Sequence, residues 1–450
     1  MGIVLEGPWP QEWFDKATVI ATGLVQAAGG DLDVARGQLL TMIPALVMPG
    51  QPDDITAALA DQVLAQPQIQ ALRAMTGSQT SRPSVADAVA VTLVVDAAGG
   101  GDFTSLREAV VAAEPGSRIM VRPGDYREGI VLNKPVDIVG DGDRDRIVVS
   151  ASGENVVLSR VDGARVANLT LRQTGGGQCP SVLVFRGSIV LEACDISGSS
   201  TAGVAVPSGG CPTVRGNRIH DNEGFGVNVS DSGAGVFEDN DIFANTTAGV
   251  VVAKGGCPTV RGNRIHDNEG FGVNVSDSGA GVFEDNDIFA NTTAGVVVAK
   301  GGCPTVRGNR IHDNEGFGVN VSDSGAGVFE DNDIFANTTA GVVVAKGGCP
   351  TVRGNRIHDN EGFGVNVSDS GAGVFEDNDI FANTTAGVVV AKGGCPTVRG
   401  NRIHDNEGFG VNVSDSGAGV FEDNDIFANP AGALTVQPGC SPTLRNNRVS

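Results

Sequence analysis

The sequence predicts a mainly β protein: a three-sheet parallel β-helix with 23 residues per coil, preceded by a small α-helical domain. Three observations lead to this prediction. A 46-residue unit recurs almost unchanged between residues 209 and 438, glycine supplies 65 of the 450 residues, and the apolar positions of the unit lie two apart. A spacing of two is typical of strands, and abundant glycine without a G-X-Y period indicates many tight turns.

Residues 1–76 form the predicted helical domain. They are rich in Ala and Leu, with helical periodicity over 11–28, 31–48 and 53–75. Asp31 and Asp53 are candidate N-caps. We find no catalytic motif here and interpret the domain as a docking or dimerisation module, joined to the solenoid by a linker at 77–90.

Residues 91–130 are predicted to cap the solenoid, which then runs over 131–450. The segment reads strand, Gly-rich turn, short helix and strands. Thr104 or Ser105 can cap a helix that continues to Ala113. Such a helix would close the open end of the core, as a solenoid requires.

The repeated unit begins at Gly209, Gly255, Gly301 and Gly347, and a fifth copy from Gly393 is identical as far as Asn429. Each unit divides into two 23-residue halves with a shared frame. Three short apolar alternations separated by Asn, Gly and Asp predict three strands and three turns, which is one coil of a parallel β-helix. The inward positions are expected to be Val214, Ile219, Val227 and Val229 in one half and Phe237, Ile242, Val250 and Val252 in the other.

The asparagines of the frame are predicted to form two ladders. Asn217 and Asn240 fall at one bend and Asn222 and Asn245 at another. Stacked amides can hydrogen-bond along the column and satisfy the backbone of the turns. Upstream, Cys194 and Ser199 occupy the same two columns.

The two halves carry opposite charges at matching positions, as "RGNRIHDN" and "EDNDIFAN" show. Adjacent coils lie about 4.8 Å apart, so Arg215 is expected beside Glu238 and Arg218 beside Asp241. Asp231 and Lys254 form a third such pair. Opposite charges on adjacent strands are favourable by roughly 0.2 to 1 kcal/mol, and a slip of one coil would bring like charges together. We interpret the alternation as control of register.

Residues 91–450 resemble the right-handed parallel β-helix superfamily, the pectin-lyase-like fold. The segment "DAAGGGDFTSLREAVVAAEPGSRIMVRPGDYREGI" is similar to the N-terminal cap of pectinesterase-like proteins. The repeats "CPTVRGNRIHDNEGFGVNV" and "FEDNDIFANTTAGVVV" resemble the β-helix of an F-box substrate receptor and of uncharacterised bacterial proteins. The resemblance implies a fold and, for the enzymes of the superfamily, catalytic Asp, Arg or Lys on the middle coils.

No catalytic residue is assigned from the sequence. It contains no G-H-G, N-T-D or D-F-I-F-G, so the hydrolase and esterase patterns match no position. Arg218 and Asp241 recur in every unit, whereas a catalytic site needs one preorganised constellation.

An alternating His/Phe stripe is a candidate side-to-side interface. The alternative is that the helical domain covers it, or that it is merely exposed. Its members are His220, Phe243, His266, Phe289, His312, Phe335, His358, Phe381, His404 and Phe427.

We expect no metal and no cofactor. Consecutive histidines are two coils apart, roughly 9.6 Å, which is too far to share a zinc ion. The acids around Glu238 are compensated by neighbouring arginines and show no calcium signature. Cysteines such as Cys211 and Cys257 have the same two-coil spacing, too great for a disulfide, so free thiols in a reducing cytoplasm are expected.

The net charge of −22 disfavours binding to nucleic acid. There is no signal peptide pattern and no apolar run long enough to span a membrane, so the expected compartment is the cytoplasm and no membrane partner is expected.

The predicted function is a non-catalytic scaffold or interaction protein whose repeat number is natural or engineered. Its partner would be a second copy, another protein or a carbohydrate. The alternatives are a carbohydrate-active lyase or hydrolase and an acidic mimic of DNA. The last coil is a candidate self-association edge because no capping helix follows it. That edge comprises Leu444, Arg445, Asn446, Asn447, Arg448 and Val449.

Overall fold

The computed structural model describes residues 21, 36, 53–64, 91–175 and 177–450. It divides into two compact units, Met1–Val89 and Ala90–Ser450. In the first unit, helix α3 spans Asp53–Leu64, within the predicted 53–75, and its described apolar side chains are buried. Ala21 and Arg36 are helical, but the remainder of the expected helices at 11–28 and 31–48, and the linker at 77–90, lie outside the described residues.

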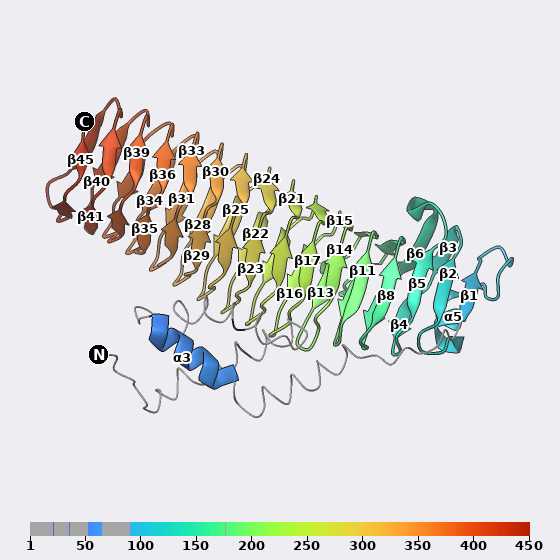
Figure 1. Cartoon of the computed structure of the whole chain (residues 1–450). Coiled ribbons are helices and arrows are strands. Elements are labelled where there is room, and N and C mark those ends of the chain that lie inside the picture. The colour runs from blue at the N-terminus through green and yellow to red at the C-terminus, as the bar shows by residue number, and fades with distance from the viewer. Residues whose placement is uncertain (1–20, 22–35, 37–52, 65–90, 176) are drawn as a thin grey trace. The chain divides into compact units, whose positions relative to one another are not determined.

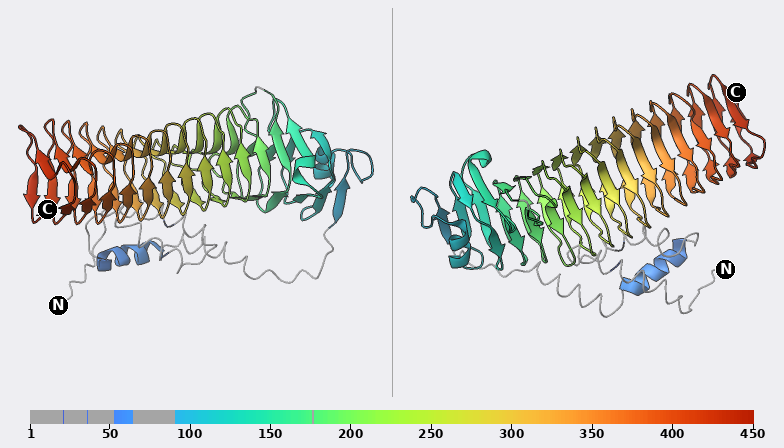
Figure 2. Two further views of the ribbon diagram at one scale, coloured as in Figure 1. Left: turned by 90° about the horizontal axis from the view of Figure 1, so that it is seen from above. Right: turned by 180° about the vertical axis from the view of Figure 1, so that it is seen from behind.

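The second unit is a right-handed parallel β-solenoid in which strands stack in chain order from β1 to β45 (Figure 1). From β2 onward every third strand joins the same sheet, so each coil of about 23 residues contributes one strand to each of three sheets. The two further views show the same stacking along the length of this unit (Figure 2). The prediction of a mainly β, three-sheet parallel solenoid is confirmed.

Sheet A contains 16 parallel strands. They are β1 (Thr92–Val95), β2 (Arg118–Val121), β5 (Asp137–Gly140), β8 (Ala164–Ala167), β11 (Ile189–Glu192), β14 (Thr213–Arg215), β17 (Val236–Glu238), β20 (Thr259–Arg261), β23 (Val282–Glu284), β26 (Thr305–Arg307), β29 (Val328–Glu330), β32 (Thr351–Arg353), β35 (Val374–Glu376), β38 (Thr397–Arg399), β41 (Val420–Glu422) and β44 (Thr443–Arg445).

Sheet B contains 15 strands. They are β3 (Gly124–Arg127), β6 (Ile147–Ala151), β9 (Thr170–Gln173), β12 (Asp195–Ser197), β15 (Arg218–His220), β18 (Asp241–Phe243), β21 (Arg264–His266), β24 (Asp287–Phe289), β27 (Arg310–His312), β30 (Asp333–Phe335), β33 (Arg356–His358), β36 (Asp379–Phe381), β39 (Arg402–His404), β42 (Asp425–Phe427) and β45 (Arg448–Val449).

Sheet C contains 14 strands. They are β4 (Ile130–Leu132), β7 (Val157–Ser159), β10 (Val182–Val184), β13 (Ala202–Val206), β16 (Phe225–Val229), β19 (Ala248–Val252), β22 (Phe271–Val275), β25 (Ala294–Val298), β28 (Phe317–Val321), β31 (Ala340–Val344), β34 (Phe363–Val367), β37 (Val388–Val390), β40 (Phe409–Val413) and β43 (Gly432–Val436).

A short helix lies at the first coils. Helix α5 spans Leu106–Ala112, and Ser105, rather than Thr104, is its N-cap, because the Ser105 hydroxyl accepts a hydrogen bond from the Glu108 N–H. Leu106, Ala109 and Val110 are buried in the same core as the first strands. A single 3-10 turn, η1 (Arg144–Arg146), precedes β6.

The core is a column of inward side chains, one layer per coil. Every predicted inward position of the first unit has no exposed surface, including Phe237, which replaces Val214 in alternate coils. Gly226 precedes one such position. A Cβ there would lie 2.7 Å from both the Gly249 carbonyl oxygen and Cγ2 of Ile242, so this position near the start of β16 requires glycine.

Two asparagine ladders run through the bends. The Asn217 side-chain amide donates to Oδ1 of Asn240 at 2.9 Å, and Oδ1 of Asn240 also accepts from the Asn217 backbone N–H at 3.0 Å. Asn222 and Asn245 repeat this arrangement at the second bend. Cys194 and Ser199 continue the two columns through their backbone N–H groups. The predicted ladders are confirmed, and all these side chains are buried.

Candidate interaction surface

Two columns of alternating charge follow sheets A and B. Arg215 is the strand neighbour of Glu238, and Arg218 of Asp241, as the sequence predicts. The ion pairs, however, point one way: Glu238 binds Arg261 of the next coil at 2.5 Å, while Arg215 reaches back to Glu192 at 3.1 Å. Each arginine of these columns therefore binds the acid of the preceding coil. Lys254 lies 3.7 Å from Asp231, in the third predicted column.

The histidines of the His/Phe stripe each bridge two carboxylates. Nε2 of His266 lies 2.9 Å from Oδ1 of Asp241, and Nδ1 lies 2.6 Å from Oδ2 of Asp267. Arg264 binds the same Asp241 at 3.1 Å. This Arg–Asp–His cluster recurs around Asp195, Asp287, Asp333 and Asp379.

The cluster around Asp195 differs from the others because Arg144 of η1 also lies 4.0 Å from this acid. Burial favours the neutral carboxyl, but the hydrogen bond from His220 and the neighbouring positive charges outweigh it and lower the pKa of Asp195. Burial likewise opposes a charged imidazole, yet the bonds to Asp195 and Asp221 raise the pKa of His220. The first cluster thus favours a charged imidazole between two carboxylates.

The rings of the stripe form one continuous stack on sheet B. His220 and Phe243 have centroids 4.8 Å apart and planes 8° from parallel, and the stacking continues to Phe427. Arginines lie over the phenylalanines, as Arg218 does over Phe243 at 5.3 Å. Both ring nitrogens of His220 are bound, Phe243 stacks on the ring, and only 13% of the side chain is exposed. Whether the stripe is an interface stays a prediction.

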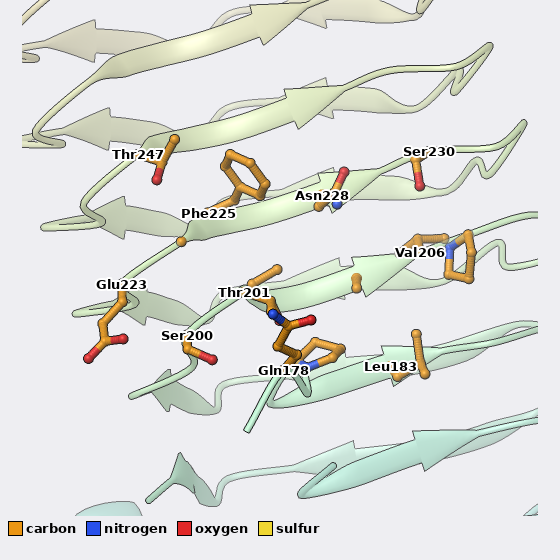
Figure 3. A pocket seen from close by; sticks show the side chains of 15 residues that line it. Gln178, Leu183, Ser200, Thr201, Val206, Glu223, Phe225, Asn228, Ser230 and Thr247 are labelled. Atoms are coloured by element: carbon orange, nitrogen blue, oxygen red, sulfur yellow. The ribbon is translucent and has the colours of Figure 1, made fainter. Parts of the chain in front are cut away.

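The outer face of sheet C is hollowed at its early coils into a groove of about 530 Å³ (Figure 3). Of its lining residues, Gln178 and Pro180 precede β10, Leu183 belongs to β10, and Phe225 and Asn228 belong to β16. Glu223 is the one charged residue among its lining residues.

Glu223, Phe225 and Asn228 recur in every unit, so the groove is the first part of a longer face. Each is replaced in alternate coils, by Thr246, Ala248 and Val251 respectively. This face was not among the surfaces predicted from the sequence. The signal was present in "EGFGVNV" and "TAGVVV", where the positions that differ between the halves are the outward ones. The recurring members are Glu223, Glu269, Glu315, Glu361 and Glu407; Phe225, Phe271, Phe317, Phe363 and Phe409; and Asn228, Asn274, Asn320, Asn366 and Asn412.

Within the described residues, no three His, Cys, Asp or Glu side chains come together in a way that could hold a metal ion. The eight cysteines are free, and burial raises the pKa of the Cys194 thiol to about 12. None of the helices described is long and apolar enough to cross a bilayer.

The predicted association edge belongs to the last coil. Leu444 and Val449 are 46% and 58% exposed. Arg445 and Arg448 bind Glu422 and Asp425 of the previous coil, at 3.9 and 2.8 Å. Asn447 extends its ladder by accepting from the Asn424 side chain at 2.8 Å, while Asn446 adopts a left-handed φ of 49° at the turn.

The sequence matches the family model described as the right handed beta helix region over residues 154–311 and 294–449, about two thirds of the chain. A search of curated proteins finds no match.

Solved structures with a similar fold include a periplasmic alginate epimerase, AlgG, with 13% identity and a TM-score of 0.45, covering 76% of this chain and 82% of that chain. The A-module of a mannuronan C-5 epimerase from Azotobacter vinelandii, AlgE4, has 18% identity and a TM-score of 0.42, covering 75% of this chain and 93% of that one. Pectate lyase Pel9A has 16% identity and a TM-score of 0.35, covering 78% and 77%. At these identities the likeness concerns the fold.

Proposed function

The chain belongs to the right-handed β-helix family, and from this premise we propose that it is a non-catalytic solenoid that serves as a rigid scaffold for a protein partner. The observation that carries the proposal is the repetition of the charged clusters. The Asp, Arg and His side chains that acid–base catalysis would need recur in five copies with the same mutual contacts, and each side chain is bound by its neighbours in the column. A repeated, internally satisfied array suits a binding surface of adjustable length.

The proposal is tested by changing the length of the solenoid. Variants that lack one or two whole 46-residue units should keep their fold, while the affinity for a protein partner captured by the full chain decreases with each unit removed. A partner that binds all lengths equally well would contradict a role for the repeated faces.

Self-association through the last coil is part of the same proposal. Its support is the exposure of Leu444 and Val449 beside strands β43, β44 and β45, each of which pairs on one side. Light scattering should show a dimer or larger assembly that Leu444→Glu with Val449→Glu disperses. If the chain is a monomer at all concentrations, self-association through the last coil is contradicted, whereas the scaffold role is not affected.

The second candidate is a carbohydrate-active lyase or hydrolase. The observation in its favour is that the Asp195 cluster alone among the five has the additional arginine, Arg144, within 4.0 Å. Incubation with alginate, pectate and neutral polysaccharides, followed by assays for new reducing ends and unsaturated products, decides between the two. If the chain depolymerises one of these polysaccharides and Asp195→Asn loses this activity, the scaffold proposal is contradicted and the chain is an enzyme.

A further inference from the structure

We propose that the outer face of sheet C binds an extended, basic, proline-rich segment of a partner protein, in polyproline II conformation with a cationic residue at every third position. This inference rests on the proposed scaffold function and names the surface and the chemistry of its partner. The surface, called the sheet C face below, consists of the Glu, Phe and Asn rows that begin at Glu223, Phe225 and Asn228.

The three rows run side by side along the solenoid. Phe225 and Asn228 lie on β16, lining the groove together with Glu223 from the turn just before it (Figure 3). In register, Phe225 is followed by Ala248 and then Phe271, and Asn228 by Val251 and then Asn274. Each row therefore repeats every second coil, at about 9.6 Å.

The Glu row supplies unpaired negative charge. All five carboxylates are exposed, and in the part of the chain that the structure describes none has an ion pair or a side-chain hydrogen bond. The arginines of the repeats bind the acids of the columns on sheets A and B instead. Five carboxylates at equal intervals favour a partner with cations at the same interval and disfavour nucleic acid and uronate polymers.

The Phe row supplies apolar notches. The five phenylalanines are half-buried, and a small alanine, buried in each case, lies between consecutive rings. On the strand spacing, the centres of consecutive rings are about 9.6 Å apart, and the alanine between them leaves a gap. A proline ring can enter such a gap, as proline-rich segments do on aromatic-lined grooves.

The Asn row supplies hydrogen-bonding groups. In the described part of the molecule its five side chains make no hydrogen bond, in contrast to the fully bonded asparagines of the two ladders. Oδ1 of Asn412 is even buried without a partner. A polyproline II segment has no internal hydrogen bonds, so its backbone groups are free to pair with these amides.

The period selects the conformation of the partner. Three residues of polyproline II advance about 9.3 Å, against about 9.6 Å for two coils. Seven residues of an α-helix advance about 10.5 Å. Over the four intervals of the face the mismatch grows to about 1.2 Å for polyproline II and to about 3.6 Å for the helix. A three-residue repeat such as Lys-Pro-X thus stays in phase with all three rows.

The test uses the full chain and a labelled peptide of five Lys-Pro-Ala triplets, with fluorescence anisotropy at low ionic strength. A control peptide has the same number of lysines at every fourth position. We expect the triplet peptide to bind and the control peptide to bind at least about tenfold more weakly, because only the first keeps each cation over a carboxylate.

Two matched protein variants locate the contact. One replaces the five glutamates of the Glu row by Gln, and the other replaces five exposed aspartates on a different turn by Asn, so both lose the same charge. We expect about tenfold weaker binding in the first, since several exposed ion pairs are lost together, and less than about threefold in the second. The second set, in the turn between sheets A and B, comprises Asp239, Asp285, Asp331, Asp377 and Asp423.

Equal loss in the two variants, or equal affinity for the two peptides, would show that binding follows net charge alone and would overturn the inference. So would the absence of binding by the triplet peptide. None of these three results affects the scaffold proposal, because the repeat-deletion and depolymerisation experiments test it without this peptide.

Discussion

His220 places Nε2 at 3.0 Å from Oδ1 of Asp195, an acid of the preceding coil, while its Nδ1 lies 2.6 Å from Oδ2 of the adjacent Asp221. The imidazole thus links two coils as well as stacking on Phe243. The contact joins the last degenerate coil to the first exact repeat. The stability of the solenoid therefore depends on whether His220 is protonated.

The stabilising effect of this contact should depend on pH. Because the folded-state pKa of His220 is raised, its contribution is fully present below the unfolded-state pKa of about 6.5 and is lost as pH rises through the folded-state value. NMR titration should place the pKa of His220 above that of an unfolded peptide. In Asp195→Asn this pKa should fall, and an unchanged value would contradict the assignment.

The same pair has an acidic limit. The pKa of Asp195 is lowered, so its contribution is present above the unfolded-state pKa of about 3.9 and is lost as pH falls through the folded-state value. The stability difference between the wild type and Asp195→Asn should be largest between these two limits. Urea unfolding at a series of pH values measures it, and a pH-independent difference would count against the linkage.

Deleting half a repeat should be more harmful than deleting a whole one. Removing residues 255–300 leaves every charged column alternating. Removing residues 232–254 brings Arg215 against Arg261 and Arg218 against Arg264, although the asparagine ladders stay continuous. The shorter deletion should lower stability by roughly 0.2 to 1 kcal/mol for each like pair, with partial recovery at high salt. Thermal melts of both variants test this prediction. Equal melting temperatures would contradict the interpretation that alternating charge controls the register of the coils.

Breaking a ladder should be costly, whereas trimming the Asn row should not. Asn240 accepts two hydrogen bonds from Asn217 and donates to Asn263 and to the Val214 carbonyl. Asn240→Ala leaves the buried partners of these hydrogen bonds unpaired. Each partner that water does not reach should lower the free energy of unfolding by about 1 to 3 kcal/mol. Asn228→Ala, on the sheet C face, should change the free energy of unfolding by less than about 0.5 kcal/mol. Similar losses in the two variants would be the contrary result.

The glycine near the start of each repeat strand of sheet C should not tolerate a side chain. A Cβ on Gly249 would lie 2.6 Å from Cγ2 of Ile265 and 2.8 Å from the Gly272 carbonyl oxygen. Gly249→Ala should cost about 1 to 3 kcal/mol through overpacking. Gly116→Ala, which meets open space but has a φ of 89°, should cost only the strain of that conformation, about 1 to 2 kcal/mol. A Gly249 variant as stable as the wild type would contradict the close packing.

The residues of the repeat were easier to interpret than the surfaces. Val214, Ile219 and Asn217 were predicted correctly because their roles depend on a two-residue alternation and on stacking at a fixed period. The sheet C face was missed because its members, such as Phe225, look like core residues in the sequence. In the folded chain Phe225 lines the outer groove, while Val227 and Val229 of the same strand remain inside.

The sequence by itself determined the period, the inward side chains, the two ladders and the neighbours in each charged column, since in-register parallel stacking places every residue beside its equivalent 23 positions away. The tertiary structure decided which neighbour each arginine binds, how His220 bridges Asp195 and Asp221, and which residues line the sheet C face. These depend on side-chain torsions and on the path of the bends. A repeating pattern specifies which residues are adjacent, whereas the direction in which a side chain points is settled only when all three sheets are packed together.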